Sequence, residues 1–188
     1  KLEMTGIKSG AQTTNDVSSG LRIVDIEGQK DNRKIDGTWY NSSIHNITMT
    51  VTPRAGSPGI DLSQAVLEIS NSSVKCILLY NTDEPEFSLN VPDGGVFGSV
   101  DGANSIFDQN PNTFGLIELE DADDTCSADS PVINRGDMVM IAINASACFN
   151  GIETRTNVWG TILPEGGSVA LFEFRVPGLS SDTVYDLY

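Results

Sequence analysis

The sequence predicts a mainly β fold: an antiparallel β-sandwich or barrel-like domain preceded by a short N-terminal α-helical segment. From Leu21 onward, about eight separate runs alternate apolar and polar residues, and turn sequences such as GSPG, VPDGG and PEGG divide them. Before Leu21, five residues recur instead at helical spacings of three and four: Met4, Ile7, Ala11, Thr14 and Val17. Because no long helical pattern separates the strands, we expect antiparallel pairing.

The helical segment covers residues 1–20 and ends at Gly20, a residue that commonly terminates helices. It opens without an N-cap, so we expect it to be the end of a longer helix. Its apolar stripe is thin and can bury little surface alone. We therefore expect it to pack on something outside this chain, and we assign residues 21–188 to a separate β domain.

Eight runs are predicted as strands, at residues 21–28, 46–53, 65–70, 74–80, 113–120, 138–146, 156–164 and 168–177. In the second run, the face with Thr48, Thr50 and Thr52 is expected to point outward. The stretch 81–112 is rich in Gly, Asn, Asp and Pro, so it is expected to be a surface loop with a short helix near Ala103–Phe107.

The composition is that of a strongly acidic globular protein. Of 188 residues, 39% are hydrophobic and 20% are charged, and Asp plus Glu outnumber Lys plus Arg by 26 to 11, giving a net charge of −15. This sign argues against binding to nucleic acid or to an anionic membrane. The charge is compatible with a high-salt habitat, with cation binding or with solubility through repulsion. No apolar run reaches the roughly 20 residues that span a bilayer, and the polar opening predicts no signal peptide.

Three cysteines, Cys76, Cys126 and Cys148, cannot all pair within one chain. None belongs to a CxxC motif, so a structural zinc site is not expected. Buried free thiols are the simpler prediction. A disulfide between Cys126 and Cys148 is the alternative, which the spacing does not support.

The densest negative charge lies in GLIELEDADDTCSADSPVINRGD, which carries seven carboxylates against one arginine. Within it, Asp121, Asp123 and Thr125 place oxygen atoms at alternate positions. A loop wrapped around Ca²⁺ needs such a pattern because the ion takes about six to eight oxygen ligands. Asp124 is a further candidate ligand, and Asp137 is a distal one, although the RGD sequence around it is more simply a tight turn.

An EF-hand is excluded because Cys126 stands where that loop requires glycine. Taken alone, the pattern leaves a solvated acidic turn as the alternative to a metal site. Mg²⁺ is also not separated from Ca²⁺. Glu118 and Glu120, which precede the loop on a predicted strand, are expected to face solvent.

No catalytic machinery is predicted. Two acids on one loop seldom reach the separation across a cleft that glycoside hydrolysis requires. The single histidine, His45, has no local nucleophile or orienting acid and is expected to be exposed at a strand edge. The larger aromatic residues lack interleaved basic residues and are expected to be core or subunit contacts: Trp39, Trp159, Phe172 and Phe174.

Four Asn-x-Ser/Thr sequons are candidate N-glycosylation sites: Asn41, Asn46, Asn71 and Asn144. Their number is close to the chance expectation, so position matters more. Asn46 on the threonine-rich face and Asn71 in the turn SNSS are expected to be accessible. Asn144 lies within an apolar strand and is the weakest candidate.

Several segments, in this order and spacing, resemble archaellin, the subunit of the archaeal swimming filament. They are QTTNDVSSGL, SPGIDLSQAVLEIS, FGLIELEDADDTCSADSPVINRGDMVMIAIN and NVWGTILPEGGSVALFEFRVP. The resemblance covers residues 12–28, 57–70 and 113–188. No single one of these segments is specific to the family, but their order and spacing together form a strong resemblance.

The resemblance implies an extracellular structural protein that assembles helically with other archaellin subunits, in a filament of one or of several subunit types. Residues 1–20 would be the polar end of a truncated core helix, and residues 21–188 the outer β domain. Since archaellins include calcium-binding and N-glycosylated members, the resemblance also favours a structural Ca²⁺ and occupancy of some sequons. The alternative function is an extracellular calcium-dependent adhesion or glycan-binding module.

Overall fold

The computed structural model describes residues 19–30, 33–35, 38–40, 43–92, 95–97, 106–107 and 111–188, with the backbone alone for 33–35 and 38–40. The predicted N-terminal helix lies outside these residues, as does most of the segment predicted as a short helix near Ala103–Phe107. Among the described residues, no helix is long and apolar enough to cross a membrane.

All eight predicted strands are confirmed, with bounds β1 (Leu21–Lys30), β4 (Ser43–Pro53), β6 (Val66–Ser70), β7 (Lys75–Tyr80), β9 (Thr113–Glu120), β11 (Met138–Asn144), β13 (Asn157–Leu163) and β14 (Ala170–Arg175). Shorter elements were not predicted: β2 (Arg33–Ile35), β3 (Thr38–Tyr40), β5 (Ile60–Asp61), η1 (Leu62–Gln64), β8 (Phe87–Ser88), β10 (Val132–Ile133), α2 (Ala145–Phe149), β12 (Ile152–Glu153) and β15 (Val184–Asp186). Pieces of two or three residues carry too little periodicity to be recognised.

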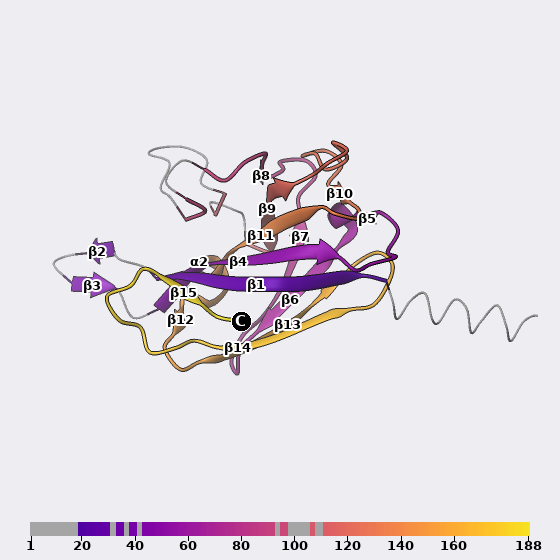
Figure 1. Cartoon of the computed structure of the whole chain (residues 1–188). Coiled ribbons are helices and arrows are strands. Elements are labelled where there is room, and N and C mark those ends of the chain that lie inside the picture. The colour runs from indigo at the N-terminus through magenta and orange to yellow at the C-terminus, as the bar shows by residue number, and fades with distance from the viewer. Residues whose placement is uncertain are drawn as a thin grey trace, which may run out of the picture.

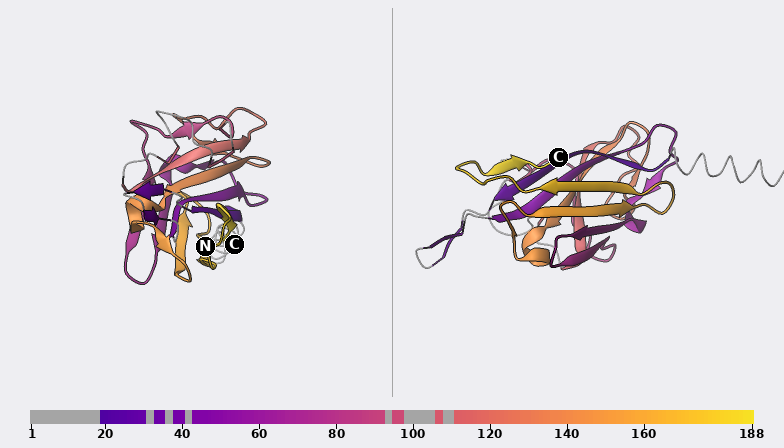
Figure 2. Two further views of the ribbon diagram at one scale, coloured as in Figure 1. Left: turned by 90° about the vertical axis from the view of Figure 1, so that its left-hand side faces the viewer. Right: turned by 90° about the horizontal axis from the view of Figure 1, so that it is seen from below.

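The long strands form one sheet in the order β14-β13-β6-β7-β9-β11-β4-β1-β15. This sheet curls on itself until Gly20, just before β1, forms an isolated bridge with Ser168, just before β14 (Figures 1 and 2). The domain is therefore mainly β and shaped as a curled half-barrel, as the predicted barrel-like fold suggests.

The pairing is mixed rather than wholly antiparallel. β7 runs parallel to β9 through Leu79–Thr113 and Tyr80–Phe114, and β8 also runs parallel to β9. A parallel pair needs a long crossover connection, and the stretch 81–112 supplies it. The prediction of antiparallel pairing is therefore wrong for the pairs of β9 with β7 and β8. The connection after β7 is long enough for the chain to return to the same end of the sheet, so that β9 starts in the same direction as β7.

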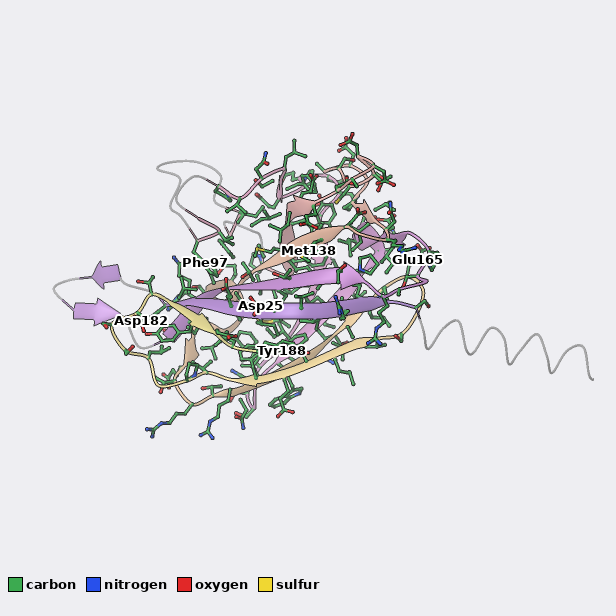
Figure 3. All side chains as sticks on the ribbon, in the orientation of Figure 1. Asp25, Phe97, Met138, Glu165, Asp182 and Tyr188 are labelled. Carbon is green, nitrogen blue, oxygen red and sulfur yellow. A yellow bond between two sulfur atoms is a disulfide. The ribbon has the colours of Figure 1, made fainter. Side chains whose placement is uncertain are left out.

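The inner face of the curled sheet holds the main core, and side chains fill the space between the strands (Figure 3). In β14, Ala170, Phe172 and Phe174 are buried while Leu171 and Glu173 are exposed, so the predicted alternation is confirmed. Gly160 in β13 lies at the tightest point of this packing. A Cβ there would come within 2.0 Å of the Glu68 carbonyl oxygen and 2.5 Å of the Phe172 ring.

The central strands are buried on both faces, which corrects one prediction. Thr48 is 1% exposed and Thr50 6% exposed, although their side of β4 is expected to face outward. The reason is a second apolar cluster over β9 and β11, built from Ile106, Phe107, Ile117 and Ala142. Thr48 lies in register with Ala142 and is covered with it.

The pairing of β1 with the edge strand β15 brings like charges together. Glu27 lies opposite Asp186 of β15. Burial raises the pKa of the Glu27 carboxyl first, and the negative charges of Asp25 and Asp186 raise it further. Like charges directly opposite on neighbouring strands destabilise a sheet.

The disulfide pairing differs from the Cys126–Cys148 bond that the sequence leaves as the alternative. Cys76 in β7 and Cys148 in α2 form the disulfide, with a Cα–Cα distance of 6.2 Å. Cys126 is free and buried, which confirms one buried thiol. The two bonded residues are separated by 72 positions, and the order β7-β9-β11 in the sheet, with α2 directly after β11, brings them together.

Candidate metal centre

The acidic loop connects β9 to β11 at one end of the sheet. Midway along it, β10 pairs with β5, so the loop is held against the rest of the domain. Hydrogen bonds within the segment 121–137 then hold the carboxylates of this loop close together.

Asp121 organises the first half of this loop. Its Oδ1 accepts hydrogen bonds from the backbone N–H groups of Asp123 and Thr125, each at 3.3 Å. Its Oδ2 accepts from the N–H of Cys126 at 2.8 Å. The loop therefore curves around this side chain, as the Asp-x-Asp-x-Thr spacing predicts for inward-pointing oxygens.

Asp123 and Thr125 contact a residue that is absent from the predicted ligands. Asn134 donates through Nδ2 to Asp123 Oδ2 at 2.8 Å and to Thr125 Oγ1 at 3.0 Å. Thr125 Oγ1 lies 2.8 Å from Asp123 Oδ1, to which it can donate. These two hydrogen bonds to the carboxylate lower the pKa of Asp123, with that from Asn134 the larger cause.

Asp137 reaches the same place through the RGD turn. Gly136 adopts a left-handed φ of 102°, and the Asp137 N–H donates to the Asn134 carbonyl at 3.1 Å. In return, the Asn134 N–H donates to Asp137 Oδ2 at 2.7 Å. The RGD sequence therefore forms the predicted tight turn, and this turn holds the Asp137 carboxylate against the backbone of Asn134.

Asp137 is the buried member of the cluster. Its residue is 1% exposed, and within the described part of the chain its Oδ1 is buried with no hydrogen-bond partner. Carboxylate oxygens of Asp121, Asp123 and Asp137 all lie within 4.8 Å of one another. An anionic oxygen buried without a partner is costly, and a bound cation would satisfy it.

The other predicted ligands lie differently. Thr125 is beside the triad, whereas Asp124 is exposed with a left-handed φ of 55° and, among the residues that the structure describes, is not part of the acidic triad. Glu120 is exposed as predicted, but Glu118 is half-buried. Burial, and then the charges of Asp121, Asp124 and Asp137, raise the pKa of Glu118.

The thiol of Cys126 is not part of the acidic triad. Burial raises the pKa of its thiol to about 12, with further contributions from the nearby charges of Glu118, Asp121 and Asp137. The thiol therefore stays protonated at neutral pH and behaves as a small apolar side chain.

Three of the predicted glycosylation sites can be placed, while Asn41 lies outside the described residues. Asn71 caps its turn, its Oδ1 accepting from the N–H groups of Ser73 and Val74 at 2.8 and 2.7 Å. Asn46 is half-buried and donates through Nδ2 to Gln29 at 2.8 Å. Asn144 caps α2 and donates through Nδ2 to the Phe107 carbonyl at 2.7 Å.

His45 is not at an exposed strand edge as expected. It is half-buried in β4, which pairs with β1 on one side and with β12 on the other at the neighbouring Ile44. Its ring nitrogens contact the hydroxyl groups of Ser43 and Ser146. An interior strand position explains the burial.

The comparisons with known proteins agree on one family. The model of archaeal-type flagellins matches residues 2–174. Flagellin B2 of Methanocaldococcus jannaschii is 34% identical over 99% of this chain and 80% of its own length. Flagellin B1 of Methanococcus voltae is 30% identical with the same two coverages.

Solved structures give the same result. The crystal structure of archaeal flagellin FlaB1 from Methanocaldococcus jannaschii superposes with a TM-score of 0.69 at 27% identity, covering 90% of this chain and 96% of that chain. The archaeal flagellum of Methanospirillum hungatei, at 11% identity and a TM-score of 0.55, covers 97% of this chain and 80% of that chain and shares the fold. The chain therefore belongs to the archaeal-type flagellins (archaellins), non-enzymatic structural subunits of the extracellular archaeal swimming filament.

Proposed function

We propose that a divalent cation at Asp121, Asp123 and Asp137 stabilises the outer domain of this filament subunit. In this proposal, residues 1–20 are the end of the filament-core helix and residues 21–188 are the outer β domain. The cation fixes the loop between β9 and β11, which would otherwise hold three carboxylates in close repulsion.

The observation that carries the proposal is the buried, unpartnered Oδ1 of Asp137. Asp121 and Asp123 contribute further carboxylate oxygens, and Thr125 Oγ1 lies 2.8 Å from Asp123 Oδ1. An all-oxygen donor set selects Ca²⁺ or Mg²⁺ over the softer transition metals. Ca²⁺ is preferred here because it tolerates irregular geometry, whereas Mg²⁺ requires near-octahedral coordination.

Thermal melting with Ca²⁺, with Mg²⁺ and with chelator tests the proposal. A ligand that binds only the folded state adds about 2.7 kcal/mol at 100 times its dissociation constant. For a domain of this size, that corresponds to a rise of about 5–11 °C in the melting temperature. Asp137→Asn should remove the rise, because it retains the shape of the side chain but carries no negative charge.

Asp129→Asn is the matched control, since Asp129 is an exposed acid of the same loop outside the triad. This variant should keep the full metal-dependent rise. If the parent protein melts at the same temperature with metal and with chelator, the proposal is wrong. It is also wrong if metal raises the melting temperature of the parent and of Asp137→Asn by the same amount.

We also propose Asn71 as the sequon best suited to N-glycosylation. It lies in the turn between β6 and β7, and its side-chain oxygen, rather than its nitrogen, makes the hydrogen bonds described above. Glycan transfer needs the amide nitrogen, which at Asn144 is engaged by the Phe107 carbonyl. Asn41 and Asn46 remain candidate sites, with Asn46 less available because of its bond to Gln29.

The subunit partners are proposed to be copies of this chain, alone or mixed with homologous flagellins. Expressing the full-length protein in an archaeal host that lacks its own flagellins tests this directly. Filaments seen by electron microscopy would show that the chain assembles with itself, whereas filaments appearing only with a second flagellin would require a mixed polymer.

A further inference from the structure

An apolar surface covers the outside of the four strands β14, β13, β6 and β7. In Figure 1, β14, β13 and β6 lie below β1, whereas β7 is labelled higher, beside β9 and β11; β14 and β13 face the viewer in the right panel of Figure 2. We call this surface the outer strand face. Of the twelve large hydrophobic side chains that are exposed in the described part of the chain, six belong to it: Ile77, Leu79, Trp159, Leu163, Val169 and Leu171.

The exposure is substantial for such residues. Leu171 is 73% exposed, and Ile77 and Leu79 are each 48% exposed. Taking about 150–250 Å² for an aromatic side chain and less for an aliphatic one, the six fractions amount to roughly 500 Å² of apolar area. This area is as large as the largest apolar patches on typical monomers. It also amounts to more than half of the ~800 Å² that one partner contributes to a standard interface.

The strand register makes the face continuous. Across β13 and β14, Thr161 lies opposite Leu171, and across β13 and β6, Leu163 lies opposite Val66. Val66 in turn lies opposite Leu79 of β7. An open hollow of about 540 Å³, lined by Trp159 and Leu171 among others, lies on this side and could receive a protruding side chain.

The charge of the outer strand face differs from that of the whole chain. Its charged side chains on the four strands are two acids and two bases: Glu68, Glu173, Lys75 and Arg175. Lys75 and Glu68 form a salt bridge at 2.8 Å. The face is therefore neutral on a protein whose net charge is −15.

We infer that the outer strand face packs against a second copy of this chain in the filament. Copies that each carry −15 repel one another over most of their surfaces, so contact is least costly where the charge cancels. The same place offers the apolar area that association needs. This inference rests on the filament role and does not depend on the proposed cation.

The contact must be heterologous, meaning that a different surface of the neighbouring copy covers this face. A face paired with itself would close a two-fold dimer, whereas a filament needs head-to-tail contacts that do not close. The loop after β8, where Leu89 is 62% exposed, lies on the opposite side of the domain in Figure 1. It therefore provides a comparison residue outside the outer strand face.

Assembly of the full-length chain in an archaeal host without its own flagellins tests the inference. The double variant Leu79→Glu/Leu171→Glu should yield at least about tenfold fewer filaments than the parent, because each change places a charge in a desolvated contact. Leu89→Glu, the same exchange at an exposed leucine on the other side, should assemble as the parent does. All variants should melt within a few degrees of the parent, since the exchanged side chains are exposed.

The outcomes separate the two ideas. A parent that forms no filament would contradict the filament role itself. A parent that assembles together with the double variant would overturn the inference alone. If Leu89→Glu fails equally, the quenching of Trp159 in parent filaments decides whether the outer strand face is covered or any added charge blocks assembly.

Trp159 gives a second readout that does not depend on a failed assembly. With Trp39→Phe, it becomes the chain's single tryptophan. On polymerisation, its quenching by acrylamide should fall at least about twofold, because interface cores pack as tightly as protein interiors. An unchanged quenching constant in intact filaments would overturn the inference.

Discussion

Loss of the Cys76–Cys148 disulfide should be the largest single-bond destabilisation in this domain. The bond joins β7 to α2, which follows β11. The two residues are separated by 72 positions, so the bond closes a long loop in the unfolded chain. Both side chains also pack partly buried against the main core.

The expected magnitude follows from the loop length. Restricting an unfolded loop of about 72 residues corresponds to roughly 4 kcal/mol at 25 °C. For a domain of this size, the melting temperature should fall by about 8–16 °C. The double variant Cys76→Ala/Cys148→Ala, unfolded in urea beside the oxidised parent, measures the loss. Its m-value should increase because an unfolded chain without the bond exposes more surface.

The single variants supply the control. Either Cys76→Ala or Cys148→Ala already breaks the bond, so each should cost nearly as much as the double variant, and the three losses should be strongly non-additive. Fully reduced parent protein should match them. A loss below about 1 kcal/mol, or two single losses that sum to the double, would refute the loop-closure reasoning.

Three further outcomes are expected. Gly160→Ala should cost about 1–3 kcal/mol in chemical unfolding through overpacking, whereas Gly166→Ala, with nothing within 4 Å of its Cβ, should be close to neutral; equal effects would contradict the packing model. Because the folded-state pKa of Glu27 is raised above 4.5, its ionised form weakens the fold at neutral pH. Glu27→Gln should therefore add a few tenths of a kcal/mol at pH 7 and nothing below about pH 4, where the parent's carboxyl is protonated; a gain that persists in acid would reverse the sign. Glycopeptide mass spectrometry of native filaments should find Asn71 occupied and Asn144 bare, and the opposite pattern would show that local hydrogen bonds do not decide occupancy.

Much of the fold is readable from the sequence because its main strands are short runs rich in apolar residues with turn residues between them. NITMTVTP alternates apolar and polar residues, MVMIAI is a continuous apolar run, and Gly- and Pro-rich turns separate most of the eight runs. The parallel step between β7 and β9 could not be read in this way, because periodicity reports which face a residue takes and not the direction of its neighbour. The burial of Thr48 was missed for a related reason: a loop covers the second face, and loop placement leaves no periodic signal.

The candidate metal site is only partly predictable from the sequence. Asp121 and Asp123 are predictable as a pair because they lie close together in one loop, so their spacing alone suggests a shared site. Asn134 and the burial of Asp137 depend instead on how the RGD turn folds back onto that loop. Asp-x-Asp-x-Thr followed about ten residues later by an Asn-x-Gly-Asp turn is the signal that could have identified them, since such a turn directs its aspartate inward.

The charge of this subunit links its two proposed sites. At an ionic strength of 0.15 M, exposed charges are screened beyond about 8 Å, so two copies in contact still feel repulsion from the acidic groups nearest their interface. A neutral outer strand face keeps such groups out of the contact, and a bound cation would cancel part of the densest remaining charge, in the loop between β9 and β11. These two features depend on different conditions: the neutral outer strand face does not require a metal ion, whereas the effect of the cation depends on the metal concentration. If both hold, chelation should loosen the acidic loop and lower the melting temperature, yet leave the subunit able to assemble through its outer strand face.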